Sequence, residues 1–300
     1  MRNYRIHGLE IESEIPLDAG VGVGSTVDLA VTLGGSDQPA LPSTEVAARF
    51  GDGDGYSVWR VADGFRLNYP GLADFRVSPT RIEVVAQVAS LELTSLLVTG
   101  NALTLALLAR AELVLHASAV EHQGRVVAFT GSSGMGKSTF AALACATGLQ
   151  LVGDDVLRVS QSPGGPICHP GSTGLRIRQG AAGVANLMPS WRRRSSIDGR
   201  LVLETPAPPT LAALPLRAVI VPGYSDRDAA PVRLRGAEAL VELLKHPRVQ
   251  GWRDPSVLEF LTRRLAELAR TVPVYKMNVR RAPPFDFALA EQVGIAVRNA

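Results

Sequence analysis

Residues 1–92 show the hydrophobic pattern of strands joined by turns. Short alternating or β-branched runs recur along this part of the chain, at residues 4–7, 9–12, 27–33, 56–61 and 81–86. A period of two is typical of strands that bury one face. Glycine-rich stretches at 34–37 and 51–55 can turn the chain between such strands. We therefore expect a small antiparallel sheet and a β-rich N-terminal domain over residues 1–92.

The pattern changes beyond residue 92. Residues 93–111 are rich in leucine and alanine, which predicts a largely buried helix, and short apolar strands then alternate with segments of helical spacing. The expected strands are 113–115, 125–130, 150–152, 156–159, 216–221 and 272–279. The expected helices are 137–147, 237–245, 255–270 and 285–299. Alternating strands and helices favour an α/β fold, so we predict a second domain over residues 93–300.

The stretches between these elements predict loops. We expect a loop or hairpin at 160–174, a basic polar loop at 191–199 and a proline-rich connector at 206–209. The arginines at 192–194 could grip an acidic peptide or a triphosphate, but a solvated loop explains them at least as well. Residues 52–55 read DGDG, as in a calcium loop, yet the other ligands of that motif are missing. A hairpin turn is the better interpretation.

Composition narrows the class of protein. Of the 300 residues, 46% are hydrophobic and 20% are charged, which is too apolar for a disordered chain. A formal net charge of +3 is far from that of a dedicated nucleic-acid binder. The two cysteines, Cys145 and Cys168, form no disulfide framework or metal-ligand spacing. Residues 1–16 lack the apolar core of a signal peptide, and the apolar run 93–109 is shorter than the roughly 20 residues of a membrane span. We expect a cytoplasmic protein without a membrane or nucleic-acid partner.

A phosphate-binding motif lies between a predicted strand and a predicted helix. Residues 131–138 read GSSGMGKS and match G-x-x-x-x-G-K-[ST] at every fixed position. Glycines let backbone N–H groups surround phosphate oxygens, the lysine adds a charge at the β- and γ-phosphates, and the serine hydroxyl can bind Mg²⁺. A chance glycine-rich turn is the weaker explanation, because motif and context agree. The expected ATP-binding residues are Gly131, Ser132, Ser133, Gly134, Met135, Gly136, Lys137, Ser138 and Thr139.

Two adjacent carboxylates follow the next predicted strand. Asp154 and Asp155 come after residues 149–153, so we expect them beside the glycine-rich motif, at the carboxyl end of the neighbouring strand. One carboxylate can hold metal while the other accepts the proton of an attacking hydroxyl. A polar turn or a helix cap is the alternative. We take Asp154, Asp155 and Lys137 as catalytic candidates, and Ser138 with Asp155 as metal ligands.

His116 precedes a predicted hairpin. Residues 121–124 read EHQG, a turn that would return the chain from His116 to the strand before the glycine-rich motif. An isolated histidine is more often a buried structural residue than a catalyst. Its predicted return to the phosphate site favours a functional role.

Together these segments resemble a known family. The series LHASAV at 115–120, GSSGMGKS at 131–138 and GDD at 153–155 resembles the C-terminal domain of HPr kinase/phosphorylase. More closely, it is similar to the HPr-kinase-like serine kinases found beside peptide-modification genes, including lasso-peptide kinases. An opening YRIHGLEIESEIPL at 4–17, PGSTGLRI at 170–177 and VPVY at 272–275 fit the same group.

The resemblance implies a P-loop, PEP-carboxykinase-like nucleotide-binding domain preceded by a small β-rich domain. It also implies ATP- and Mg²⁺-dependent phosphorylation of a serine on a peptide or small protein, such as a lasso-type precursor. Lys137 and Ser138 would serve nucleotide and Mg²⁺, an aspartate would act as base, and Arg176 would contact phosphate or substrate. The chain departs from the bifunctional enzymes around 174–177, where an E-x-R-G-L-G-I-type segment is missing. Phosphorylase activity and HPr as the substrate are therefore in doubt.

Two other functions remain open. A nucleotide-dependent regulator or scaffold would need the glycine-rich motif but neither the second aspartate nor His116. A small-molecule kinase would need an enclosed apolar pocket near Asp155. The phosphate acceptor and the oligomeric state, including a homo-oligomer, are left open by the sequence.

Overall fold

The computed structural model describes residues 1–22, 24, 26–35, 41–42, 44–51, 55–206, 212–225, 230–280 and 285–300. They form a mixed α/β structure with several sheets, divided into two compact units. The first unit comprises Met1–Val114 and Arg248–Arg263, and the second comprises Leu115–Pro247 and Arg264–Ala300. The division predicted at residue 92 differs from these bounds. Most of the DGDG turn and of the 206–209 connector lies outside the described residues.

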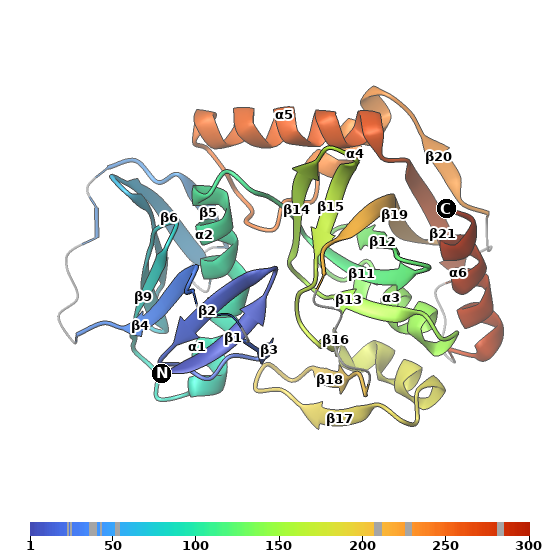
Figure 1. Cartoon of the computed structure of the whole chain (residues 1–300), viewed down its shortest axis with the longest axis horizontal. Coiled ribbons are helices and arrows are strands. Elements are labelled where there is room, and N and C mark those ends of the chain that lie inside the picture. The colour runs from blue at the N-terminus through green and yellow to red at the C-terminus, as the bar shows by residue number, and fades with distance from the viewer. Residues whose placement is uncertain are drawn as a thin grey trace. The chain divides into compact units, whose positions relative to one another are not determined.

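A mixed sheet forms the body of the first unit (Figure 1). Its strands are β1 (Arg2–Ile6), β2 (Leu9–Ser13), β3 (Gly20–Val21), β4 (Leu29–Leu33), β5 (Ala48–Phe50), β6 (Tyr56–Val61), β7 (Gly64–Tyr69), β8 (Ala73–Val77) and β9 (Arg81–Ala86). They lie in the order β3-β1-β2-β4-β9-β8-β7-β6-β5. The expected strands are confirmed, but the expectation of a small antiparallel sheet is wrong. β4 pairs in parallel with both β2 and β9, because long connections on either side of β4 permit crossovers that a tight turn forbids.

The predicted helix over 93–111 is confirmed with a π-helical turn in it. It consists of α1 (Leu91–Leu97), η1 (Val98–Ala102) and α2 (Leu103–Ala109), and the Ser90 side chain caps its first turn. In the described chain, Leu91–Ala109 is the segment that is long and apolar enough to cross a membrane, and 61% of its most apolar 18-residue stretch is buried inside the protein. Length alone therefore does not exclude a span, contrary to our expectation. The α2 part of this segment packs against β7 and β9, as the core helix of a folded unit does.

A late segment of the chain returns to the first unit. The Gly251 carbonyl accepts a hydrogen bond from the Arg49 N–H at 3.1 Å, and the Tyr56 hydroxyl accepts one from the Gln250 N–H at 2.7 Å. The Arg248 guanidinium donates to the Asn101 side chain and occupies the space in which a Cβ on Gly100 would lie. This packing gives the π-helical turn a structural reason, since the local widening admits the arginine.

The second unit contains another mixed sheet. Its strands are β11 (Ala117–His122), β12 (Arg125–Thr130), β13 (Gln150–Gly153), β14 (Leu157–Ser162), β15 (Gly165–His169), β19 (Leu214–Ser225), β20 (Val232–Leu234) and β21 (Val274–Arg280), while β10 (Leu113–Leu115) precedes His116. β14, β15, β19, β12, β11 and β13 follow one another across it, with β21 beside β19 and β20 beside β21. The β11–β12 hairpin is confirmed, and Gln123 and Gly124 form its turn with φ of 51° and 74°.

The order of these strands corrects one expectation. β13 is not the direct neighbour of β12, because β11 lies between them and pairs antiparallel with both. Ala117 is opposite Thr130 of β12, and Ala119 is opposite Gly153 of β13. The start of β11 therefore lies at the carboxyl ends of β12 and β13, where the sequence motifs of the site begin.

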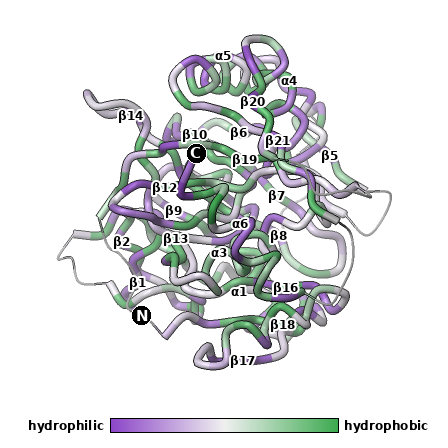
Figure 2. The backbone as a smooth tube through the Cα atoms, turned by 90° about the vertical axis from the view of Figure 1, so that its right-hand side faces the viewer, coloured by the Kyte–Doolittle hydropathy of each residue, from purple (hydrophilic) through white to green (hydrophobic). Residues whose placement is uncertain are grey.

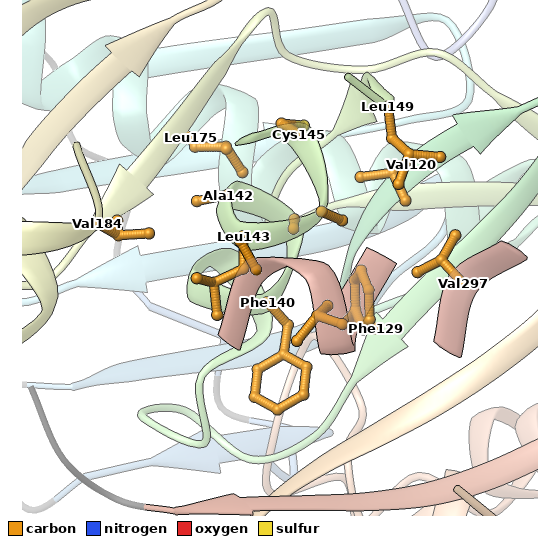
Figure 3. Close-up of a cluster of buried hydrophobic side chains, with 14 of the residues drawn as sticks. Val120, Phe129, Phe140, Ala142, Leu143, Cys145, Leu149, Leu175, Val184 and Val297 are labelled. Atoms are coloured by element: carbon orange, nitrogen blue, oxygen red, sulfur yellow. The ribbon is translucent and has the colours of Figure 1, made fainter. Parts of the chain in front are cut away.

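Two helices close the apolar core of this unit. α3 (Lys137–Ala146) packs against α6 (Phe287–Asn299), β11 and β12. Phe140 of α3 lies beside Phe129 of β12, with 5.8 Å between the ring centroids. Figure 3 shows side chains of α3 among residues from other elements, including Val120, Leu149, Leu175, Val184 and Val297. This core fixes the first turn of α3 relative to the end of β12.

A small sheet and two further helices complete the described elements. β16 (Gly174–Ile177), β18 (Leu201–Glu204) and β17 (Arg192–Ser195) form the sheet in that order, and the 3₁₀ helix η2 (Gln179–Leu187) follows β16. The loop expected at 191–199 is thus partly wrong, since β17 pairs with β18 and Arg194 bonds Glu204 at 2.7 Å. The predicted helices α4 (Ala237–Leu244) and α5 (Pro255–Thr271) are confirmed. Hydrophobic and hydrophilic residues alternate along α5 (Figure 2), as expected of an amphipathic helix.

Candidate functional site

The segment between β12 and α3, residues 131–136, forms a glycine-rich loop. Gly134 and Gly136 have φ of 86° and 91°, in the left-handed region that favours glycine. A Cβ added to Gly136 would also collide with the Tyr224 hydroxyl. Residues 132–135 are exposed, and the first N–H groups of a helix are free to bind an anion. The loop therefore offers an open surface of backbone donors at the start of α3.

Lys137 lies under this loop. Its side chain is buried, and Nζ donates hydrogen bonds to the carbonyl oxygens of Gly131 at 2.9 Å and Ser132 at 3.2 Å. The ammonium group therefore joins the start of α3 to the start of the loop and places a positive charge where phosphates would lie. Thr139 is buried in the first turn of α3, and the exposed Met135 side chain is on the outer part of the loop.

Asp154 is buried and surrounded by hydrogen-bond donors. Its Oδ1 accepts hydrogen bonds from the hydroxyls of Ser118 and Ser138, the latter at 2.8 Å, and its Oδ2 accepts one from the Arg176 N–H at 2.8 Å. Burial raises the pKa of the Asp154 carboxyl, and these donors only partly oppose that effect. The carboxylate links β11, α3 and β16 at one point.

Asp155, unlike Asp154, is partly exposed and lies beside a histidine. Its side chain is 36% exposed, and its Oδ1 lies 3.2 Å from Nε2 of the largely buried His116. Asp155 adopts a φ of 73°, a strained conformation for a residue other than glycine and one often retained at functional sites. The strain allows consecutive aspartates to serve different partners, Ser138 for Asp154 and His116 for Asp155.

Arg178, rather than the expected Arg176, directs its side chain to the glycine-rich loop. The Arg176 guanidinium pairs with Asp198 at 2.7 Å, so Arg176 reaches the site through its backbone N–H to Asp154. Arg178 instead donates from Nη2 to the Ser133 hydroxyl at 2.9 Å. The sequence motifs did not indicate a role for Arg178, although it lies only two residues after the candidate Arg176.

A histidine from a distant segment also contacts the loop. His246, just after α4, places Nδ1 3.1 Å from the Ser132 Oγ. No motif near residue 246 indicated this contact, because it depends on how α4 packs. The glycine-rich loop is therefore contacted by His246 at Ser132 and by Arg178 at Ser133.

The residues present fit a nucleoside triphosphate with Mg²⁺. The loop supplies exposed backbone donors, Lys137 supplies a charge, and the Ser138 hydroxyl and the Asp154 carboxylate lie in contact. Among the described residues, no group of three or more His, Cys, Asp or Glu side chains is placed to hold a metal ion. A Mg²⁺ ion at such a loop needs only one or two protein ligands, since phosphates and water provide the others. The structure places Asp154, rather than the expected Asp155, beside Ser138.

Comparison with known proteins assigns no family to the chain. No protein-family model matches the chain, and no curated protein matches it. Among solved structures, it is similar to the Hpr(Ser) kinase/phosphatase from Coxiella burnetii, with 15% identity and a TM-score of 0.32. The match covers 62% of this chain and 95% of that one. A likeness of this degree shows neither a shared family nor a shared activity.

Proposed function

We propose that this protein is an ATP- and Mg²⁺-dependent kinase that phosphorylates a serine hydroxyl of a peptide or small protein. The observation that carries the proposal is the hydrogen bond from Ser138 at the start of α3 to Asp154, with the Asp155–His116 pair directly adjoining it. A loop that only binds nucleotide needs the first contact but has no use for the second. The lasso-type precursor suggested by the sequence motifs is one substrate of the proposed class.

Each residue has a distinct part in this proposal. Bound ATP and Mg²⁺ supply the transferable phosphoryl group and the cation that neutralises its charge. Lys137 and the loop N–H groups hold the phosphates, while Asp154 fixes the Ser138 hydroxyl as a metal ligand. Asp155 is exposed enough to receive the proton of an incoming hydroxyl. His116 orients the Asp155 carboxylate from its buried position.

Composition and burial guide the choice of partners. We infer a cytoplasmic protein, because its two cysteines are buried and free. A peptide or small protein is the proposed partner, and the nearly balanced charge of the chain is compatible with it. Nucleic acid is disfavoured as a partner by the small net charge of +3.

A phosphotransfer assay with two peptide libraries tests the proposal. The purified full chain is incubated with γ-labelled ATP, Mg²⁺ and a library of serine-containing peptides, or with the same library carrying alanine for serine. We expect phosphoserine only in the first library, and its loss in Lys137→Ala. Lys276→Ala, at an exposed position of β21, is the matched control and should keep activity. ATP binding without phosphoserine in either library would contradict kinase activity and favour a nucleotide-dependent regulator.

A further inference from the structure

His246 is fixed between the glycine-rich loop and α4. Its Nδ1 lies 3.1 Å from the Ser132 Oγ, and its Nε2 lies 3.3 Å from Oε1 of Glu242, one helical turn earlier. Only 8% of the His246 side chain is exposed. A ring that is held on both sides and largely buried has a defined orientation, with one nitrogen directed at the loop.

The partners of the ring indicate its tautomer. A carboxylate can only accept a hydrogen bond, so the Nε2 of neutral His246 carries the proton and donates it to Glu242. Nδ1 then accepts a hydrogen bond from the Ser132 hydroxyl. If the ring gains a proton, Nδ1 becomes a donor directed at the loop, while the contact with Glu242 is kept.

Burial and two neighbouring ammonium groups disfavour protonation of the His246 ring in the protein by itself. Burial lowers the pKa of His246, and the ammonium groups of Lys137 and Lys245 lower it further, against the opposing effect of Glu242. Glu242 is shared, since Lys245 also donates to it at 2.8 Å. The charged groups facing His246 are thus Glu242, Lys245 and Lys137, and two of these three repel a proton.

Phosphate bound at the loop would reverse this balance. An anion held by Lys137 and the loop N–H groups offsets the lysine charge and favours a protonated imidazole beside it. We propose that His246 is a further phosphate-binding residue, which takes up a proton when phosphates occupy the loop and then adds a second positive charge beside Lys137. The proton comes from solvent, and Glu242 holds the ring in position. This inference rests on the proposed nucleotide-binding function and adds proton uptake to it.

Calorimetry measures this proton uptake directly. ATP with Mg²⁺ is titrated into the full chain at about pH 7.5, in buffers of low and high ionisation enthalpy, where free histidine is mostly neutral. The wild-type protein should show a binding enthalpy that depends on the buffer. In His246→Gln that dependence should vanish and the affinity should fall about tenfold, the effect of one charged hydrogen bond. Tripolyphosphate should reproduce the proton uptake, whereas adenosine should not.

Two further variants, compared with His246→Gln, separate a phosphate ligand from a structural residue. Glu242→Gln keeps the ring but removes the carboxylate that favours its charge, so it should reduce proton uptake without abolishing ATP binding. His122→Gln, at the far end of the β11–β12 hairpin, is the matched control and should bind as the wild type does. Thermal unfolding of each variant shows that it is folded.

Two outcomes would overturn the proposal. If wild-type protein binds ATP with the same enthalpy in both buffers, or His246→Gln retains full affinity and proton uptake, His246 is not a phosphate ligand while the nucleotide site stands. If wild-type protein binds neither ATP nor tripolyphosphate, the proposed nucleotide site itself is wrong, and the role of His246 is wrong with it.

Discussion

The Ser138 hydroxyl donates a 2.8 Å hydrogen bond to the buried carboxylate of Asp154. This bond joins the first turn of α3 to the end of β13, although β11 separates β12 from β13 in the sheet. Ser118 of β11 donates to the same oxygen, so β11, the end of β13 and the first turn of α3 meet at Asp154. The carboxylate is therefore both a structural link and the candidate that orients a metal-binding hydroxyl.

The buried position of Asp154 predicts an unusual pH dependence of stability. Because its folded-state pKa is raised above the usual 3.8, its contribution is complete below that value and is lost as pH rises through the folded pKa. Asp154→Asn resembles the protonated form at every pH. Relative to the variant, the wild-type protein should lose free energy of unfolding between about pH 4 and about pH 7. Urea unfolding at both values measures this, and a constant difference would contradict it.

Asp155 and His116 should affect transfer rather than nucleotide binding. Asp155→Asn keeps a residue that tolerates the positive φ but removes the proton acceptor, so kcat should fall by about 10²–10⁴-fold. His116→Gln should also lower kcat, and the double variant should lose little more than Asp155→Asn alone, because the two act as a unit. ATP affinity, measured by calorimetry, should stay unchanged in all three. A parallel loss of affinity would instead show that the pair shapes the nucleotide site.

Gly136 and Gly148 provide a matched comparison, since both have a φ of 91°. Alanine at either position should cost about 1–2 kcal/mol of unfolding free energy for the left-handed backbone. Only Gly136→Ala also meets the Tyr224 hydroxyl, whereas nothing lies near Gly148. Gly136→Ala should therefore be the less stable variant and should lose ATP affinity, and adding Tyr224→Phe should restore part of its stability. Equal stability of the two alanine variants in urea unfolding would argue against the collision.

Arg178 and Arg176 should give opposite phenotypes. Arg178 is exposed and contacts the loop at Ser133, so Arg178→Ala should weaken ATP binding about three- to tenfold at low salt, with little change in thermal stability. Arg178→Lys should keep part of the affinity. Arg176→Ala should instead lower the unfolding free energy by about 1 kcal/mol by freeing Asp198. Calorimetry and thermal unfolding of both variants distinguish the roles, and equal ATP affinities would show that Arg178 is not a ligand.

The Arg176–Asp198 pair adds a pH signature of its own. Partial burial would raise the pKa of Asp198, but the Arg176 hydrogen bond and charge lower it overall. A lowered pKa gives stability that is present above the usual value of 3.8 and lost as pH falls. Acid unfolding of Arg176→Ala should therefore depend less on pH than that of the wild-type protein, as circular dichroism during an acid titration would show.

The amino-acid sequence by itself was enough to predict the local parts of the site. Residues 125–147 contain a strand, a glycine-rich loop and a helix in their observed places, because hydrophobic period and glycine content act over a few residues. The 115–130 hairpin follows for the same reason, since the turn at Gln123 and Gly124 sets its pairing.

Only the tertiary structure decided which distant groups complete the site. It placed β11 between β12 and β13, directed Arg176 to Asp198 and Arg178 to the loop, and brought His246 to Ser132. It also returned residues 248–263 to the first unit and made β4 parallel to its neighbours. Such contacts join residues far apart along the chain, and their formation depends on which apolar faces can be buried together. That balance belongs to the whole fold, so no single segment of the sequence contains it.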